Sequence, residues 1–170
     1  MQTLARTDTP AAVDYVEPQQ YLTFMLGGEM FAIGIVVIKE IIEYGQVTPV
    51  PRMPDFIRGV INLRGAVVPV IDLSARFGRG PGVIGRRTCI VIIETGLGAD
   101  IQTLGVMVDS VSEVLEIPSA EIEPPPSFGT HIRTDFIAGM GKVRGKFVII
   151  LDVNHVLSTE EMADLVQSGL

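Results

Sequence analysis

DFIRGVINLRGAVVPVID, residues 55–72, has a near copy eighty residues later, DFIAGMGKVRGKFVIILD at residues 135–152. Eight of the eighteen positions are identical, whereas background composition would give about one. The identical pairs are Asp55/Asp135, Phe56/Phe136, Ile57/Ile137, Gly59/Gly139, Arg64/Arg144, Gly65/Gly145, Val68/Val148 and Asp72/Asp152. Self-similarity at a fixed spacing is the signature of a repeated structural unit. The chain is therefore predicted to be an internal duplication.

A weaker sequence similarity precedes each copy and extends the repeat towards the N-terminus. At a spacing of seventy-three, Ile38, Glu40, Ile41, Ile42 and Pro51 match Val111, Glu113, Val114, Leu115 and Pro124. Residues 21–24 likewise resemble residues 90–93 as the opening strand of each half. These matches predict two units of about seventy residues, a first barrel over about 20–87 and a second over about 88–157.

Each half consists of short β-branched runs separated by glycine and proline, which is typical of strands and tight turns. We therefore expect an all-β protein of two small barrels that share apolar surface, because barrels of this size are marginal alone. Single helical turns are predicted at residues 73–77 and 153–157, and the capping box at 158–161 predicts a short C-terminal helix within residues 158–170. Residues 1–19 are predicted to be a flexible tail. Gly65 and Gly145 each precede a strand, where a hairpin turn needs a positive φ.

Composition limits the function classes. The 20 acidic residues outnumber the 13 basic ones, for a net charge of −7, which opposes binding to nucleic acid or to an anionic membrane. Between residues 88 and 132 there are seven acidic residues and no lysine or arginine. This uneven charge either orients docking partners or reflects chance variation in the composition of solvated loops. No apolar run is long enough to cross a bilayer and Cys89 is the only cysteine, so we expect a cytoplasmic protein.

Several catalytic or cofactor motifs can be tested and set aside. Gly80, Gly82 and Gly85 form a nominal G-x-G-x-x-G, but a β-rich run follows where a dinucleotide fold needs a helix. His131 and His155 are twenty-four residues apart, so no metal site is predicted.

Cys89 lies in a β-rich apolar run and is expected to be packed rather than activated. Asp72 and Asp152 occupy equivalent ends of the repeat and are expected to cap helical turns. We expect no enzyme activity and no cofactor, with a nucleic-acid-binding barrel or a small β-barrel enzyme as the alternatives.

FAIGIVVIKEIIEYGQVTPVPRMPDFIRGVINLRGAVVPVIDL, residues 31–73, resembles the first half of the CheW family and includes the N-L-R-G motif at residues 62–65. LGVMVDSVSEVLEIPSAEIEPPP, residues 104–126, and the second repeat resemble the rest, so that the resemblance covers about residues 20–165. It implies two intertwined SH3-like five-stranded barrels. It also implies a scaffold that binds the cytoplasmic tip of methyl-accepting chemotaxis receptors and the regulatory domain of the histidine kinase CheA. Such a scaffold is recruited to receptor arrays at the inner membrane and can self-associate there.

The resemblance assigns expected contacts by position. A receptor-facing groove would comprise Ile38, Glu40, Asn62, Arg64 and Gly65 from the first half, with Val108 and Val111 from the second. The kinase surface would lie on the second barrel around Thr88, Cys89 and Gly105. The sequence LGAD at residues 97–100 looks like an insertion in a hairpin tip near that surface.

Overall fold

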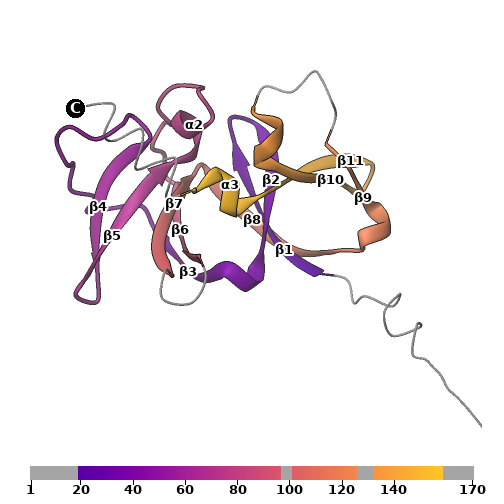
Figure 1. The fold of residues 1–170 in the computed structure, drawn as a ribbon, viewed down its shortest axis with the longest axis horizontal. Coiled ribbons are helices and arrows are strands. Elements are labelled where there is room, and N and C mark those ends of the chain that lie inside the picture. The colour runs from indigo at the N-terminus through magenta and orange to yellow at the C-terminus, as the bar shows by residue number, and fades with distance from the viewer. Residues whose placement is uncertain (1–18, 97–100, 126–131, 159–170) are drawn as a thin grey trace, which may run out of the picture.

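Two sheets make up the protein, seen in a computed structural model that describes residues 19–96, 101–125 and 132–158 (Figure 1). One sheet has the order β3-β6-β7-β5-β4 and the other β8-β1-β2-β11-β10-β9. We call them the five-stranded barrel and the six-stranded barrel. The strands are β1 (Gln19–Leu26), β2 (Glu29–Gly34), β3 (Ile38–Glu43), β4 (Ile57–Leu63), β5 (Ala66–Asp72), β6 (Cys89–Thr95), β7 (Gln102–Val108), β8 (Ser110–Ile117), β9 (Ile122–Glu123), β10 (Ile137–Val143) and β11 (Lys146–Leu151).

Within the described residues, helical structure is limited to single turns. These are η1 (Ile35–Val37), α2 (Leu73–Arg76), η3 (Ser119–Glu121), η4 (Thr134–Phe136) and α3 (Val153–Val156). The predicted turns at 73–77 and 153–157 are therefore confirmed as α2 and α3. The predicted N-terminal tail up to residue 18, the insertion at 97–100, His131 and the predicted helix beyond residue 158 lie outside the described residues. No helix in the described ranges is long and apolar enough to span a membrane.

The two halves exchange their opening hairpins. The five-stranded barrel takes β3, β4 and β5 from the first half and the hairpin β6–β7 from the second, while β1–β2 joins β8–β11. The predicted boundaries of 20–87 and 88–157 for the two barrels are therefore wrong, although the intertwining is confirmed. The repeat identifies which segments are equivalent, but equivalent hairpins offer the same hydrogen-bonding edges to both copies. Sequence similarity therefore cannot tell which copy a hairpin joins.

The pairing pattern shows how closely the barrels correspond. β5 lies parallel to β7 and β11 lies parallel to β2, and all other pairings are antiparallel. The β4–β5 and β10–β11 hairpins shift register at the same place, just before Gly59 and Gly139. The two-residue strand β9 is the sixth strand, and its counterpart in the other barrel is a single bridge between Thr48 and Val60.

The repeated turn has a defined backbone. Arg64 and Gly65 have φ values of 53° and 89°, and Arg144 and Gly145 have 52° and 78°. Two successive positive φ values are typical of a type I′ hairpin turn, whose twist matches that of the strands. The predicted hairpin corners are confirmed, but the arginines share the left-handed conformation that the sequence predicted only for the glycines. An arginine in this conformation is uncommon, so its side chain must have a separate role.

The aspartates at the ends of the repeats are helix caps, as predicted. The carboxylate of Asp72 accepts a hydrogen bond from the backbone N–H of Ala75 at 3.2 Å, and that of Asp152 accepts one from His155 at 3.2 Å. Asp72 is completely buried, and it also accepts from the N–H of Gly82 at 2.9 Å and lies 3.6 Å from Arg58. This carboxylate therefore fixes the loop between the halves as well as the helical turn.

The largest apolar cluster of the described residues runs through both barrels, and each barrel also has a smaller cluster of its own. The rings of Phe24, Phe31, Phe77 and Phe136 form a chain with centroid separations of 6.0, 5.6 and 5.9 Å. Phe24 and Phe31 lie on β1 and β2 of the six-stranded barrel, while Phe77 follows α2. The same cluster includes residues of β6 and β7 such as Ile93. The predicted sharing of apolar surface is confirmed, and it joins two units that would each have a small core.

Candidate partner-binding site

The arginine of the N-L-R-G motif makes an ion pair across the five-stranded barrel. Arg64 lies at the tip of the β4–β5 hairpin, and its guanidinium binds the carboxylate of Glu40 on β3 through two nitrogens. The hydrogen bond from Arg64 lowers the pKa of Glu40 below its usual value and outweighs the effect of desolvation. The side chain of Asn62 accepts a hydrogen bond from the N–H of Gly65 at 2.9 Å. The structure therefore brings together four of the predicted receptor-contact residues in one exposed cluster.

The same ion pair is present in the other copy. Arg144 at the tip of β10–β11 binds Glu113 on β8 at 3.0 Å. Glu40 and Glu113 are equivalent in the weaker repeat, and Arg64 and Arg144 in the stronger one. The pair therefore explains why both turns carry an arginine. The hydrogen bond of Asn62 cannot be repeated, since the equivalent residue is Lys142, which has no acceptor.

A groove lies beside each of these hairpins. The Arg64 groove has a volume of about 470 Å³ and is lined by Lys39, the hairpin residues 63–64 and 66–69, and residues 102–104 of β7. The Arg144 groove has a volume of about 510 Å³ and is lined by equivalent residues of β10–β11 and β2, together with β8. Within each groove an apolar residue of the hairpin is exposed, Val67 at 72% and Phe147 at 53%. The duplication has therefore produced two grooves at corresponding places.

The two grooves differ in their chemistry. Met25, Met30 and Met140 line the Arg144 groove, and methionine adapts readily to irregular apolar surfaces. Its hairpin reads KVRGKF, where the Arg64 hairpin reads NLRGAV. The Arg144 groove was not predicted from the sequence. The change of Asn62, Ala66 and Val67 to lysine, lysine and phenylalanine in the repeat was the available signal.

The remaining predicted receptor residues lie where the chain crosses between the barrels. Ile38 begins β3 and Val111 belongs to β8, and both are half-buried against the shared core. Val108, at the end of β7, is completely buried in that core. The predicted contact of Val108 with a partner is therefore corrected, because its side chain has no exposed surface. The side chain of Val108 instead packs in the core at the point where the chain crosses between the barrels.

The predicted kinase contacts need a larger correction. Cys89 and Gly105 lie on β6 and β7, and Thr88 directly precedes β6, so all three belong to the five-stranded barrel. Gly105 is buried, and a Cβ atom there would lie 2.7 Å from Ile90. Thr88 is also buried, and its hydroxyl accepts a hydrogen bond from the N–H of Gly85 at 2.7 Å. Of the three residues, only Cys89 reaches the surface, and it is half-buried.

The thiol of Cys89 is not activated. Burial raises its pKa, and the nearby carboxylate of Glu43 adds to the increase. Because the thiolate is the reactive form, a raised pKa makes the thiol a poor nucleophile. The prediction of a packed cysteine is confirmed.

The nominal dinucleotide motif is a loop. It follows α2 and leads into β6, whereas in a dinucleotide-binding fold the motif leads into a helix. Within residues 19–96, 101–125 and 132–158, no three His, Cys, Asp or Glu side chains gather in a metal-binding arrangement.

The comparisons with known proteins all find the same family. The family model for the CheW-like domain matches residues 20–161. The chemotaxis protein CheW of Klebsiella aerogenes is 37% identical over 145 residues, which is 85% of each chain. CheW of Bacillus subtilis is 36% identical over 143 residues, covering 84% of this chain and 88% of the relative.

A solved structure agrees with the sequence relatives. The scaffolding protein TtCheW from Thermoanaerobacter tengcongensis superimposes with a TM-score of 0.74 at 37% identity, covering 84% of this chain and 89% of that one. The family match includes both exchanged hairpins and both arginine turns. The chain therefore belongs to the CheW-like family.

Proposed function

We propose that the protein is a non-enzymatic scaffold that couples methyl-accepting chemotaxis receptors to the histidine kinase CheA. The observation that carries the proposal is the exposed cluster of Asn62, Arg64 and Gly65 at the edge of the Arg64 groove. The family match supports it, since related proteins are chemotaxis proteins and one is described as a scaffold. The proposed place of action is the cytoplasm at receptor arrays near the inner membrane, where copies of the protein also self-associate.

The receptor tip is assigned to the Arg64 groove. A coiled-coil tip presents helical ridges, and a groove with an apolar wall and a charged rim fits a helix. Arg64 is 69% exposed while it pairs with Glu40, so its guanidinium has donors left for a partner. Arginine is a frequent interface anchor because its planar fork makes several hydrogen bonds at once. Ile38 adds a half-buried apolar residue next to Lys39 of this groove, whereas the half-buried Val111 lies beside Cys89.

The regulatory domain of CheA is assigned to the surface at the start of β6. Cys89 is half-buried there, next to the exposed Arg86 and Arg87. Thr88 and Gly105 hold this surface in place from the interior. Cys89 and the part of β7 that lines the Arg64 groove lie at opposite ends of the antiparallel pair β6–β7, which allows both partners to bind at once.

Reconstitution of the three components tests the proposal. We expect the protein to raise CheA autophosphorylation only when receptor is present, and to show no kinase or hydrolase activity alone. Unchanged kinase output on addition of the protein would contradict the proposal. Binding of oligonucleotides in place of receptor and kinase would instead support the nucleic-acid alternative.

A further inference from the structure

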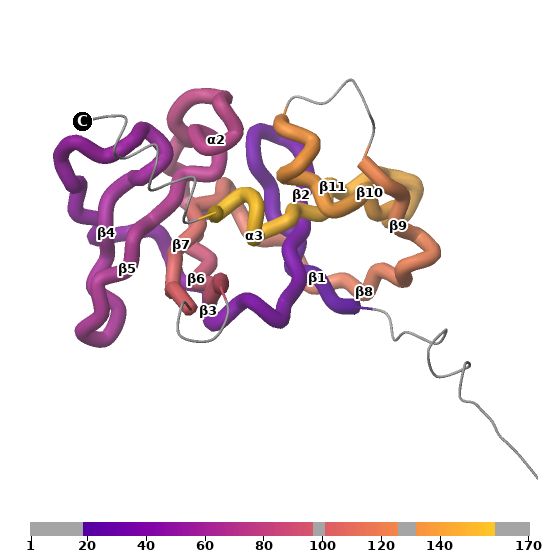
Figure 2. The backbone as a smooth tube through the Cα atoms, in the orientation of Figure 1, coloured from indigo at the N-terminus to yellow at the C-terminus, as the bar shows by residue number. Residues whose placement is uncertain are grey.

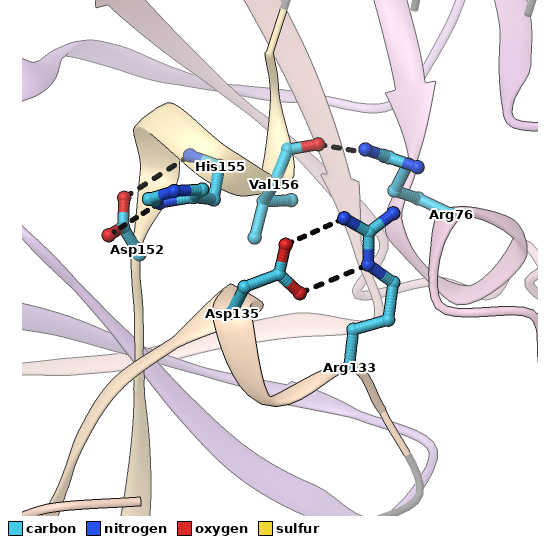
Figure 3. A network of polar contacts seen from close by, with 6 residues as sticks. All are labelled: Arg76, Arg133, Asp135, Asp152, His155 and Val156. Atoms are coloured by element: carbon cyan, nitrogen blue, oxygen red, sulfur yellow. Dashed lines mark hydrogen bonds and ion pairs between the residues drawn. The ribbon is translucent and has the colours of Figure 1, made fainter. Parts of the chain in front are cut away.

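Arg76 joins the two repeats at equivalent positions of their sequences. Its position in the first repeat corresponds to Val156 in the second, since both end the helical turn after the last repeated strand. Arg76 is only 9% exposed, and its Nε donates a hydrogen bond of 2.7 Å to the backbone carbonyl of Val156 itself (Figure 3). An arginine on α2 thus binds its own counterpart on α3. Only one copy has the arginine, so the contact is asymmetric.

The guanidinium of Arg76 also lies over one ring from each repeat. Its central carbon is 5.3 Å from the centroid of Phe56 and 4.8 Å from that of Phe136. These phenylalanines are repeat equivalents, and they precede β4 and β10 in different barrels. Burial of a cation is costly unless its donors and its charge find partners, and the rings and the carbonyl supply them.

Other links also join the two barrels. The chain crosses between them twice, through η1 and through Asp109, and β3 and η1 form the crossing in the lower part of Figure 2. The shared apolar core adds attraction, but the hydrophobic effect is non-directional. A hydrogen bond between a planar guanidinium and a fixed carbonyl is directional. The ion pair of Arg79 with Glu29 at 2.6 Å is a second directional link, made from the turn that follows α2, and it is more exposed.

We propose that Arg76 is a positioning residue that fixes the angle between the two barrels. It thereby sets the relative placement of the Arg64 groove and the crossing residues Ile38 and Val111. The effect of Arg76 on the angle between the barrels does not depend on what the protein binds, whereas its effect on signalling rests on the proposed scaffold function.

Distance measurement between spin labels tests the geometric part. Ala66 and Lys146 are exposed, equivalent positions in the two hairpins, so Ala66→Cys and Lys146→Cys in a Cys89→Ser background report the angle between the barrels. In the full chain, we expect Arg76→Val, which copies the residue of the other repeat, to broaden or shift the label distance. Arg133→Val is the matched control, because Arg133 stacks on the same Phe136 ring at 4.4 Å but pairs with Asp135 in its own segment. An unchanged distance in Arg76→Val overturns the proposal.

A milder substitution tests the proposal if the Arg76→Val variant does not fold. Arg76→Gln keeps a side-chain N–H donor and loses the charge, so it should give a smaller change in distance. If circular dichroism shows that Arg76→Val is unfolded, the result with Arg76→Gln decides. If both variants are unfolded, Arg76 is a residue of overall stability and the proposal is wrong.

Binding measurements test the functional part. Arg76→Val should leave the affinity for receptor fragments alone and for the CheA regulatory domain alone nearly unchanged. It should weaken assembly of the ternary complex by about tenfold, or roughly 1.4 kcal/mol. An altered label distance with full ternary assembly would overturn the functional part alone. If the wild-type protein binds neither partner, the proposed function fails, and the label distances still decide the role of Arg76.

Discussion

Arg64 and Arg144 allow a comparison within one molecule. Both have the same left-handed backbone, and both pair with an equivalent glutamate. They differ in their neighbour, which is Asn62 in one copy and Lys142 in the other. Any purely structural role of the arginine should therefore be shared, whereas a role in receptor binding need not be.

Arg64→Asp should abolish receptor binding, with a loss of about 2 kcal/mol or more, as expected for an interface anchor. Its melting temperature should change little, because exposed ion pairs contribute about 0–1 kcal/mol and aspartate tolerates a positive φ. Arg144→Asp should weaken receptor binding much less. Pull-down assays and melting curves for both variants are the measurements. Equal losses of binding, or an unfolded Arg64→Asp variant, would make the arginine a scaffold residue.

The ion pair also predicts a dependence on pH. Because Arg64 lowers the pKa of Glu40 in the folded protein, the stabilisation is present above the unfolded pKa, about 4.3 for glutamate. It is lost as the pH falls through the folded pKa. The carboxylate resonance of Glu40 should therefore titrate at a lower pH in the wild type than in Arg64→Gln. Identical titration curves would show that the pair does not persist in solution.

Cys89→Ser should leave coupling between receptor and kinase nearly intact. The raised pKa of the thiol disfavours the reactive thiolate at neutral pH, and a hydroxyl is close in size to the thiol. A small loss in the free energy of unfolding, about 1 kcal/mol, is expected from placing a hydroxyl at a half-buried site. Oxidation or alkylation that switched kinase output in the wild type, but not in Cys89→Ser, would contradict this.

Among the elements, the repeated hairpin was the most predictable. Its strands, its glycine turn and the caps Asp72 and Asp152 all follow from residue type and spacing, because each depends on contacts close in sequence. The exchange of β1–β2 and β6–β7 could not be predicted from the repeat itself, since both copies offer equivalent edges, and only the family resemblance implied that the barrels intertwine. The burial of Thr88 and Gly105 was missed for a related reason, as it depends on the strand that each hairpin meets.

Gly59→Ala should destabilise the β4–β5 hairpin strongly. Gly59 has a φ of +149°, and a Cβ atom there would lie 2.2 Å from the carbonyl oxygen of Thr48. Relief requires movement of the backbone, and we expect a loss of more than about 2 kcal/mol in the free energy of unfolding.

Gly65→Ala is the matched control for this prediction. Its φ is +89°, but no atom lies within 4 Å of the added Cβ, so only backbone strain of about 1 kcal/mol is expected. Chemical denaturation of both variants gives the comparison. A smaller loss in Gly59→Ala than in Gly65→Ala would show that the close approach to Thr48 can relax.

For the whole molecule, the exchange of hairpins makes the halves interdependent. Residues 1–87 and 88–170 expressed separately should each lack cooperative folding, because each half lacks the hairpin that completes the barrel formed by its remaining strands. When mixed, the two fragments should assemble into one folded complex. Circular dichroism and size-exclusion chromatography distinguish these states. A cooperative, monomeric fold in either half alone would show that a hairpin can close on its own copy.

The exchange also decides when the protein can fold during synthesis. The five-stranded barrel lacks its hairpin until β7 ends at Val108, and β2 waits for β11, which ends at Leu151. At about 5–20 residues per second, the first hairpin remains without its parallel neighbour for several seconds after it leaves the ribosome. During that time Phe24 and Phe31, which are completely buried in the finished protein, have no core to enter. The nascent chain therefore exposes these two rings to aggregation until β11 has been synthesised.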